Sequence, residues 1–477
     1  MQTEAVEPRM RARQWRRVAR QLVVIGGLVA ISPAARAQQS GQVAPPPPPQ
    51  EQVEEEASAS GDPLLAPPPA APRSIRSWEE AISMMRARSP DYRTSQDAIA
   101  RASAQTRVAL ANLLPTVTGQ GSYTHQFFTE SIPFGGATLV TPPPNVAGLS
   151  ASLSWTPFNA RAIYGMGTAE RNVDVAQLAF EDRRRQLAAS VVDAILGTLA
   201  AERVAELNRV GLRTALERLV LTQTRLKYAQ GIALDVDRAQ QDVASARVVL
   251  INGDETLRQS RESLGVVLGS QSPVAPPADL DLDAFERAVA TTCHLNEDIE
   301  RRPDIVAARA RVDVAQRLIK DAELMTVPTL GVQSQLAYNS AVAFGPLTTW
   351  SVAGVIIVPF YDGGARYGLR RDSQAAADQA QQALAAARLA AVVASARAHR
   401  AVSVTAAARE QARQQRDLAA RVDQRTRDGY AHGLGTSLDL VTSAQALRQA
   451  DINLAVLEFQ VAEARANAVL ANAECVY

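Results

Sequence analysis

The chain of 477 residues is poor in the residues that build compact globular cores. Aromatic residues make up 5% of it, and it contains only 2 cysteines. A set of conventional globular domains would need a richer aromatic complement, so this composition favours a long, helical, Ala-rich architecture. Only two lysines occur, Lys227 and Lys320, and the other basic side chains are arginines interleaved with acids. Such interleaving is typical of solvated helix faces rather than of a binding patch.

Net charge and catalytic motifs are scarce as well. The formal net charge is +1, which excludes the concentrated basic surface that nucleic-acid binding requires. Serine nucleophile motifs and phosphate-binding loops are absent from the sequence. The 4 histidines have no metal-ligand spacing with a cysteine or with one another: His125, His294, His399 and His432. We therefore expect no enzyme activity, no catalytic residue, no metal and no cofactor.

The apolar run near the N-terminus is too short for a membrane-spanning helix. It extends from Leu22 to Ile31, about half of the roughly 20 residues that such a helix needs. An arginine-rich stretch precedes it, and Ala35-Arg36-Ala37 follows it. A basic region, a short apolar run and a small-residue cleavage site are typical of an export signal. We interpret residues 1–37 as a signal peptide that is removed after Ala37.

Residues 38–73 differ in composition from the rest of the chain. They contain the proline clusters Pro45–Pro49 and Pro67–Pro69 and an acidic patch at Glu54–Glu56. Large apolar side chains are almost absent, so the stretch cannot bury enough surface to fold alone. We expect a disordered or polyproline-like linker here.

An internal duplication is the strongest signal in the sequence. Tyr228-Ala229-Gln230-Gly231-Ile232 recurs as Tyr430-Ala431-His432-Gly433-Leu434 at a shift of about 202 residues. Farther upstream the shift is about 213, because the first copy has about eleven extra residues in a loop between Pro115 and Pro157. We divide the folded chain into a first repeat over 74–270, an inter-repeat segment over 271–300 and a second repeat over 301–477.

Each repeat has the order helix, two strands, very long helix, tight turn and long helix. Residues 159–229 hold no proline and would span roughly 105 Å as one helix, which is too long for a compact globular domain. Apolar residues recur along it at steps of four and three, as in the seam of a coiled coil. We expect helical hairpins over 159–269 and 364–474, each reversed at a glycine, Gly231 or Gly433.

Alternating stretches ahead of each hairpin predict strand pairs, 115–128 with 146–157 and 327–339 with 348–360. From Leu149 to Thr156, for example, apolar and polar residues alternate, which gives one apolar and one polar face. Four strands cannot close a barrel, and open edges cannot face lipid because each unpaired backbone group there costs several kcal/mol. Three chains of four strands supply 12, so we predict a trimer with a 12-stranded transmembrane barrel whose polar faces line the pore.

Two motifs of the second repeat resemble those of the TolC-like outer-membrane efflux factor family. Arg301–Ile305 looks like the start of the family's second half, and Pro359–Gly364 looks like its turn from barrel to helix. In the first copy that turn has diverged to Pro157–Arg161. The likeness runs from Trp78 to Ala473. It implies an α+β membrane protein: a trimer with an outer-membrane β-barrel, an α-helical coiled-coil tunnel through the periplasm, and an equatorial belt that includes the inter-repeat segment.

The resemblance implies the outer-membrane channel of a tripartite efflux or type I secretion system. Such a channel would conduct substrates passively from a periplasmic adaptor protein and an inner-membrane pump to the exterior, with outer-membrane lipid around its barrel. Two other classes stay open on the residues alone: a periplasmic adaptor, which also has long helical hairpins, and a structural coiled-coil envelope protein. The amphipathic strands and the duplication argue against both.

The resemblance also assigns a gate at the inner end of the tunnel. In the family, an aspartate of the first copy and a tyrosine of the second hydrogen-bond between helix pairs; the matching residues here are Asp237 and Tyr430. A ring of aspartates that narrows the aperture corresponds to Asp439, and crowding of like charges in a trimer should raise its pKa. The family's arginine two residues past the second tip glycine is Gly435 here, so one link is missing.

The two hairpin tips are also the predicted docking surface for the adaptor. They lie farthest from the barrel, they need glycine to reverse the chain, and they carry apolar side chains that we expect to be exposed. The residues concerned are Gly231, Ile232, Gly433 and Leu434.

The two cysteines, Cys293 and Cys475, fall near helix ends that the duplicated topology would bring to the belt. Because the periplasm is oxidising, we expect a disulfide between them, and two unpaired thiols are the alternative.

Overall fold

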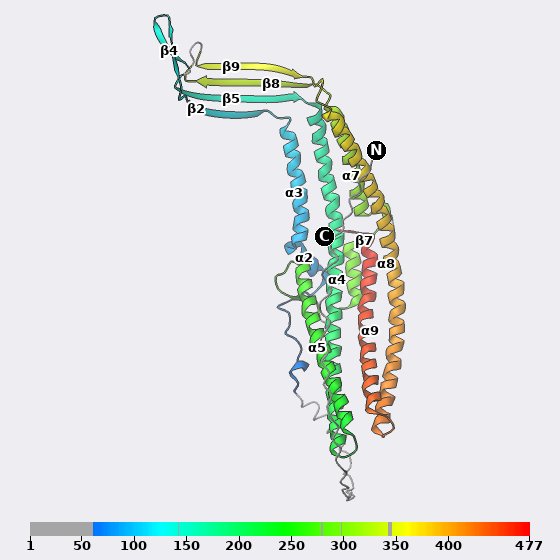
Figure 1. Cartoon of the computed structure of the whole chain (residues 1–477). Coiled ribbons are helices and arrows are strands. Elements are labelled where there is room, and N and C mark those ends of the chain that lie inside the picture. The colour runs from blue at the N-terminus through cyan, green and yellow to red at the C-terminus, as the bar shows by residue number, and fades with distance from the viewer. Residues whose placement is uncertain (1–60, 142, 278–279, 297, 342–345) are drawn as a thin grey trace, which may run out of the picture. The chain divides into compact units, whose positions relative to one another are not determined.

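The computed structural model of the chain describes residues 61–141, 143–277, 280–296, 298–341 and 346–477 (Figure 1). The expected signal peptide, 1–37, and most of the expected linker, 38–60, lie outside the described residues. Among the helices in these ranges, none combines the length and the apolar character needed to cross a membrane.

Two long helical hairpins dominate the described chain. In the first repeat α4 (Ala160–Lys227) turns into α5 (Ala233–Val267), and in the second α8 (Ala365–Ala431) turns into α9 (Ser437–Leu470). With 68 residues, α4 is about 100 Å long. Its first turn begins at Asn159, whose side-chain oxygen accepts a hydrogen bond from the Ala162 N–H at 3.1 Å. The expected α+β architecture with two hairpins and four main strands is confirmed.

The shorter helices precede the strands of each repeat or lie between the repeats. In the first repeat α2 (Trp78–Arg88) and α3 (Pro90–Ala111) precede the strands, and in the second α7 (Pro303–Leu324) does so. Proline opens α3 and α7 at a position where a missing N–H costs nothing. Between the repeats lies α6 (Leu282–Thr292), and two short 3₁₀ turns, η1 (Pro63–Leu65) and η2 (Ile299–Arg301), complete the helices.

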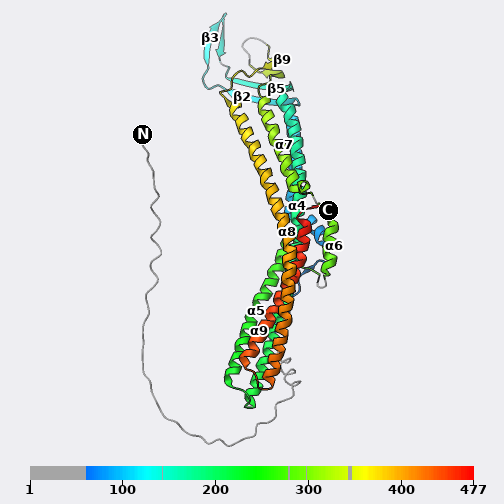
Figure 2. The same ribbon diagram turned by 90° about the vertical axis from the view of Figure 1, so that its right-hand side faces the viewer.

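The longest helix, α4, lies in the middle of the helices, which form a layer near the strands and draw together in the tip half, where α5 also contacts α9 (Figure 2). Near the strands it packs against α3 and α7, and α7 packs against α8. Toward the hairpin tips it packs against α5 and α9, and α9 packs against α8 (Figure 1). Figure 2 shows α5 and α9 side by side in the tip half. One lateral edge of the layer is therefore α8, and the other is α3 followed by α5.

Four antiparallel strands form the main sheet, in the order β2-β5-β8-β9. They are β2 (Thr116–His125), β5 (Asn145–Phe158), β8 (Thr329–Asn339) and β9 (Thr348–Ile357). The register places Gly121, Leu149, Tyr338 and Thr348 in one row, and Thr118 opposite Ser152 with their hydroxyl oxygens 2.7 Å apart. The pairing therefore gathers the alternating residues of all four strands into one mainly apolar face and one mainly polar face.

Three small sheets were not expected from the sequence. The longer loop of the first repeat contains a hairpin of β3 (Glu130–Phe134) and β4 (Ala137–Thr141). Its turn, Gly135-Gly136, has positive φ at both residues, as a two-residue type I′ hairpin turn requires. Next to the helices, β1 (Arg73–Ser74) pairs with β6 (Val274–Ala275), and β7 (Cys293–Leu295) pairs with β10 (Ala473–Cys475).

The described end of the expected linker, residues 61–73, is ordered against the first hairpin. Asp62 forms an ion pair with Arg247 of α5 at 2.9 Å, and Leu64 and Leu65 pack on the apolar cluster between α4 and α5. The Pro69 carbonyl accepts a hydrogen bond from Arg261 at 3.2 Å. For these residues the prediction of a disordered linker is wrong, because the hairpin supplies the apolar surface that the segment itself lacks.

The largest apolar core lies at the waist, where the ends of both repeats meet α4. Trp78 of α2 packs edge-on against Phe285 of α6, with ring centroids 5.6 Å apart, and its indole N–H donates to Thr292 at 3.0 Å. Other fully buried members come from α2, α4, α5 and α9: Met85, Leu196, Leu264 and Leu470. A smaller cluster in the tip half holds Leu212, Leu216, Val243 and Leu250.

Gly269 gives a test of this waist. It follows α5 with φ +71, and a Cβ there would collide with the Arg88 backbone and lie 2.6 Å from the Ser89 nitrogen. We expect Gly269→Ala to destabilise the protein by roughly 1–3 kcal/mol. The matched control is Gly197→Ala at an exposed position of α4, where a Cβ meets nothing within 4 Å; it should stabilise the helix by about 0.5–1 kcal/mol.

Thermal denaturation of both variants measures the two effects. Equal midpoints for Gly269→Ala and Gly197→Ala would contradict the close packing of α5 on the end of α2.

Candidate functional site

Both hairpin tips close with the same backbone turn, but at different sequence positions. After α4, Ala229 has φ 56, and the Gln230 N–H bonds the Arg225 carbonyl at 2.8 Å. After α8, Gly433 has φ 74, and the Leu434 N–H bonds the Gly429 carbonyl at 2.8 Å. The structural shift between the turns is 433 − 229 = 204 residues, whereas the sequence motif repeats at 430 − 228 = 202.

The expectation that both tip glycines supply the reversal is therefore correct for Gly433 and wrong for Gly231. At the first tip the left-handed residue is Ala229. Gly231 does not have a positive φ, and a Cβ there would be in ordinary van der Waals contact, 3.4 Å from the Arg225 Cβ. Gly435 is its counterpart at a shift of 204, with a Cβ 3.3 Å from the Tyr430 nitrogen.

The same shift makes Asp235, rather than Asp237, the counterpart of Asp439. Both lie at the third position of their helices, which begin at Ala233 and Ser437. Asp439 forms a capping box: its carboxylate accepts from the Thr436 backbone N–H at 3.2 Å, and the Asp439 N–H donates to the Thr436 hydroxyl oxygen at 3.2 Å. Ile232 precedes α5 and provides no side-chain cap.

The capping box also sets the titration of Asp439 in a single chain. Hydrogen bonds from the Thr436 hydroxyl and N–H lower the pKa of Asp439 below its ordinary value of 3.8. A lowered pKa means that the box stabilises α9 above about pH 4 and is lost as the pH falls through the folded-state pKa. The expected rise through crowding concerns three copies together, which a single chain does not contain.

Tyr430 lies between the two hairpins and is 6% exposed. The Arg225 guanidinium of α4 stacks on its ring, 4.5 Å from the centroid, and donates to its backbone carbonyl at 2.9 Å. Burial and the nearby charge of Asp235 raise the pKa of Tyr430, and Arg225 opposes that rise. Asp237 is exposed, and no hydrogen bond joins it to Tyr430 within the described residues.

A second contact joins the hairpins at the tips. The Ser437 hydroxyl at the start of α9 donates to the Asp235 carboxylate, and Arg238 donates to the Ser437 oxygen at 3.3 Å. Asp235 also lies 3.9 Å from Arg238. Arg225, Asp235 and Ser437 are therefore the tip residues that sequence reasoning missed. A structural alignment of the two turns would have revealed Asp235, because it shares its helix position with Asp439.

Apolar side chains are exposed at both tips. Ile232 is 58% exposed and Leu434 is 87% exposed. Leu234 and Leu438 beside them are also largely exposed. In one chain each tip therefore presents bare aliphatic surface beside the polar contacts, which is typical of a docking site.

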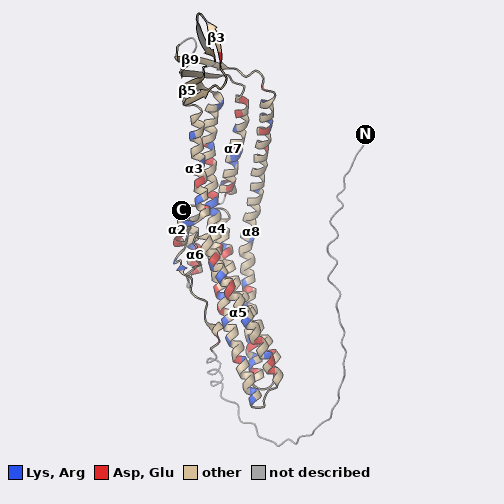
Figure 3. Ribbon diagram, turned by 60° about the vertical axis from the view of Figure 1, so that its left-hand side comes forward, with Lys and Arg blue, Asp and Glu red and all other residues tan. Residues whose placement is uncertain are grey.

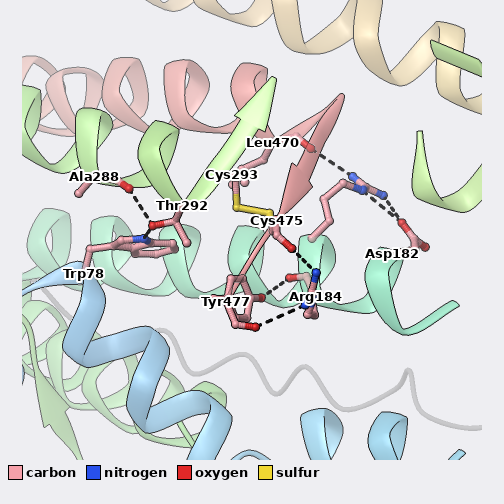
Figure 4. Close-up of a disulfide and its surroundings, with 10 residues drawn as sticks. Trp78, Asp182, Arg184, Ala288, Thr292, Cys293, Leu470, Cys475 and Tyr477 are labelled. Carbon is pink, nitrogen blue, oxygen red and sulfur yellow. Dashed lines mark hydrogen bonds and ion pairs between the residues drawn. A yellow bond between two sulfur atoms is a disulfide. The ribbon is translucent and has the colours of Figure 1, made fainter. Parts of the chain in front are cut away.

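At the waist, Cys293 and Cys475 are joined in a disulfide and are both buried (Figure 4). They are opposite residues of the β7–β10 ladder, so the bond ties the inter-repeat segment to the end of the chain. Arg184 of α4 donates to the Cys475 carbonyl at 2.5 Å, and Arg185 donates to the Leu470 carbonyl at 3.4 Å. The Tyr477 hydroxyl donates back to the Arg184 carbonyl at 2.5 Å.

Thiol chemistry tests this pairing. We expect denatured, unreduced protein to show no maleimide labelling, and reduced protein to show two labelled cysteines. A Cys293→Ser with Cys475→Ser variant should lose about 2–5 kcal/mol of stability, because the bond closes a loop of 182 residues. Labelling of both cysteines before reduction would contradict the bond.

Charges of both signs are interspersed along the helices (Figure 3). By contrast, the strands β2, β5, β8 and β9 contain no Asp, Glu, Lys or Arg. In the ranges that the structure covers, no group of three or more His, Cys, Asp and Glu side chains is placed to hold a metal ion. The described residues therefore form an uncharged sheet, a waist that contains a disulfide, and polar contacts between the two hairpin tips.

Known proteins share both this sequence pattern and this fold. The family profile described as outer membrane efflux protein matches residues 81–270 and 295–472. The toluene efflux pump outer membrane protein TtgC of Pseudomonas putida is 26% identical over 269 residues, which cover 55% of this chain and 54% of TtgC. The alignment thus spans about half the length of that relative.

Solved structures match over most of the chain. A membrane protein from Pseudomonas aeruginosa superposes with a TM-score of 0.68 and 20% identity over 85% of this chain and 98% of that protein. CusC superposes with a TM-score of 0.70 and 17% identity over 86% of this chain and 95% of CusC. At these identities the structures establish the fold, while the profile covers both repeats. The chain belongs to the outer membrane efflux protein family.

Proposed function

We propose that the chain is the outer-membrane channel of a tripartite efflux or type I secretion system, assembled as a homotrimer that extends into the periplasm. It conducts substrates passively and is not an enzyme. The observation that carries the proposal is an uncharged, two-faced sheet with two open edges, joined to two long helical hairpins.

The open edges favour assembly in the outer membrane. Among the residues that the structure describes, β2 and β9 each pair on one side only. In lipid the free side must be satisfied by another strand, since an unpaired backbone group costs several kcal/mol. When β9 of one copy pairs with β2 of the next, three copies close an antiparallel barrel with the apolar face toward lipid.

The ends of the strands suit the two membrane interfaces. Phe127 and Phe128 beyond the end of β2 are strongly exposed, as are Phe360 and Tyr361 beyond the end of β9. Between them the strands have about 10 residues, the length of a tilted transmembrane strand. Aromatic residues at both interfaces are typical of outer-membrane barrels.

The helix layer offers matching apolar edges to neighbouring copies. The free side of α8 carries exposed Leu389, Val404, Leu418 and Val422, which recur on one stripe of the helix. On the opposite edge, α5 exposes Val248 and Ile251. Ring closure of three copies brings α8 of each against the α3 and α5 edge of the next, which covers both stripes.

The rival classes fit the chain less well. Four uncharged, amphipathic strands precede helices of about 100 Å in this chain. Neither a periplasmic adaptor nor a structural coiled-coil envelope protein requires such strands. We therefore assign the adaptor and the inner-membrane pump as partners of this chain. TtgC, a relative, bears the name of a toluene efflux pump outer membrane protein.

The tips are the proposed adaptor-docking surface, centred on Gly231, Ile232, Gly433 and Leu434. We expect Ile232→Asp with Leu434→Asp to abolish export, because two charges replace exposed aliphatic side chains, and to leave the trimer intact. The matched control, Ile232→Val with Leu434→Val, should export normally. Export assays in cells, with trimer content by gel, measure both. Normal export by the aspartate variant would refute the docking surface.

The tips are also the proposed gate. Tyr430 and Asp235 take part in the contacts between hairpins, while Asp237 and Asp439 are exposed and free to face neighbouring copies. A hydrogen bond contributes only about 1–3 kcal/mol, so three copies can hold the gate and still yield to a docked adaptor.

Single-channel conductance in planar bilayers tests the gate. We expect Asp237→Ala with Tyr430→Phe to give larger or more frequent openings than the parent protein, because it removes the carboxylate and the hydroxyl of the proposed gate bond and keeps the Arg225 contacts. Asp235→Ala should do the same by releasing Ser437. If neither variant opens more than the parent, the gate assignment is wrong.

A further inference from the structure

A buried polar cluster joins the hairpins above their tips. Asp242 of α5 is 2% exposed. Its carboxylate accepts from Arg218 of α4 at 2.5 Å and from the Gln445 amide of α9 at 2.9 Å. One carboxylate thus accepts a hydrogen bond from its own hairpin and another from the second hairpin. We name Arg218, Asp242, Gln445 and Arg448 the mid-hairpin node.

Arg448 adds a steric interlock to the node. Its side chain crosses from α9 onto α4 at Gly211, where a Cβ would lie 2.5 Å from the Arg448 Cδ and 3.6 Å from its Cγ. The aliphatic stem of Arg448 therefore fills a notch that only glycine leaves. Burial lowers the pKa of Arg448, and the carboxylate of Asp242 opposes that effect, so the two charges are electrostatically coupled.

The contact between α4 and α9 continues from the node to the waist. The Asn467 amide of α9 donates to Asp193 of α4 at 2.9 Å. Farther up, Arg185 reaches the Leu470 carbonyl, and the disulfide ties the end of the chain beside it. Above the node the two hairpins are therefore joined at successive levels.

The contacts below the node are of a different kind. Ser437 offers a hydroxyl to Asp235, and Arg225 of α4 stacks on Tyr430 of α8 and donates to its carbonyl. Each of these contacts joins one charged side chain of the first hairpin to a neutral group of the second, so parting of the tips separates no pair of opposite charges. Parting at the node would pull Gln445 and Arg448 from the buried Asp242 and empty the notch at Gly211.

We propose that the mid-hairpin node is a pivot: the hairpins part below it when the channel opens and stay joined at it. This proposal rests on the proposed tip gate. The node lies about 10–16 Å above the tip contacts, counted as 7 residues along α5 and 11 along α9. Opening is then a movement of the last turns of each hairpin, and the waist is not disturbed.

Two engineered disulfides test the pivot. Gly211→Cys with Arg448→Cys locks the node, and Asp235→Cys with Ser437→Cys locks the tips. The native cysteines are already paired, so oxidation acts on the introduced pair. Each variant is compared with its reduced form by single-channel opening and by export, and the single-cysteine variants are the controls.

We expect oxidation of the node pair to change export less than about twofold, and oxidation of the tip pair to reduce it more than about tenfold, because only the tips part in the open state. Loss of export on oxidising the node pair, together with loss on oxidising the tip pair, would overturn the pivot and leave the gate standing. Full export with oxidised tips would overturn the tip gate and the pivot with it.

A second variant keeps the pivot testable if the node pair fails to assemble. Gly211→Ala should displace Arg448 and let the hairpins part higher up, with more frequent openings than the parent. Gly197→Ala, in the same helix without a neighbour, should behave as the parent. Unchanged openings in Gly211→Ala would contradict the pivot.

Discussion

The need to pair every backbone group of the sheet governs the rest of this structure. The four main strands carry no formal charge, and one chain leaves both edges of their sheet open. Water can satisfy such edges, whereas lipid cannot. The sheet therefore folds within one chain but can enter a membrane only when neighbouring chains supply the missing strands. The apolar stripes on α8 and α5 lie on the two lateral edges that the same closure would bring together.

The helices are subject to a second constraint: they must pack closely side by side and still keep fixed positions along one another. Small residues allow close approach: Gly253 of α5 lies against Asn208 of α4, whose Nδ2 would be 2.6 Å from an added Cβ. Helix faces made of small residues offer few side chains that stop one helix from sliding along the other, so polar contacts fix the relative positions of the helices. Arg209 pairs with Asp254, and Arg218 pairs with Asp242, in the interior of the first hairpin. The two hairpins also differ, because the first has leucines in its core, whereas α8 buries no leucine and half of its buried residues are alanines.

Much of this fold could be predicted from the sequence because its periodicities are long and regular. The proline-free stretch before Tyr228 predicts α4, and strict alternation from Leu149 to Thr156 predicts β5. The disulfide could be predicted because two cysteines allow a single pairing within the chain. The tip contacts were harder to predict. The repeated tyrosine and glycine motif aligns at 202 residues, while the turns align at 204, because Ala229 adopts the left-handed conformation that Gly433 adopts in the second repeat.

Contacts between residues far apart in the chain could not be predicted from the sequence for a related reason. Residues 61–73 look too polar and too proline-rich to fold alone, yet Leu64 and Leu65 lie on a hairpin that begins about 95 residues later. From the sequence, Asp242 resembles a solvent-exposed acid on a helix, and its burial depends on Arg218 and Gln445 from two other helices.

The proposed channel depends most directly on closure of the sheet by copies of the same chain. Native mass spectrometry of the protein extracted in detergent from outer-membrane fractions measures the number of copies in one particle. We expect a particle of three chains, each lacking the signal peptide. A stable particle of one or two chains, recovered from the same membrane and able to conduct ions, would show that closure by three copies is wrong.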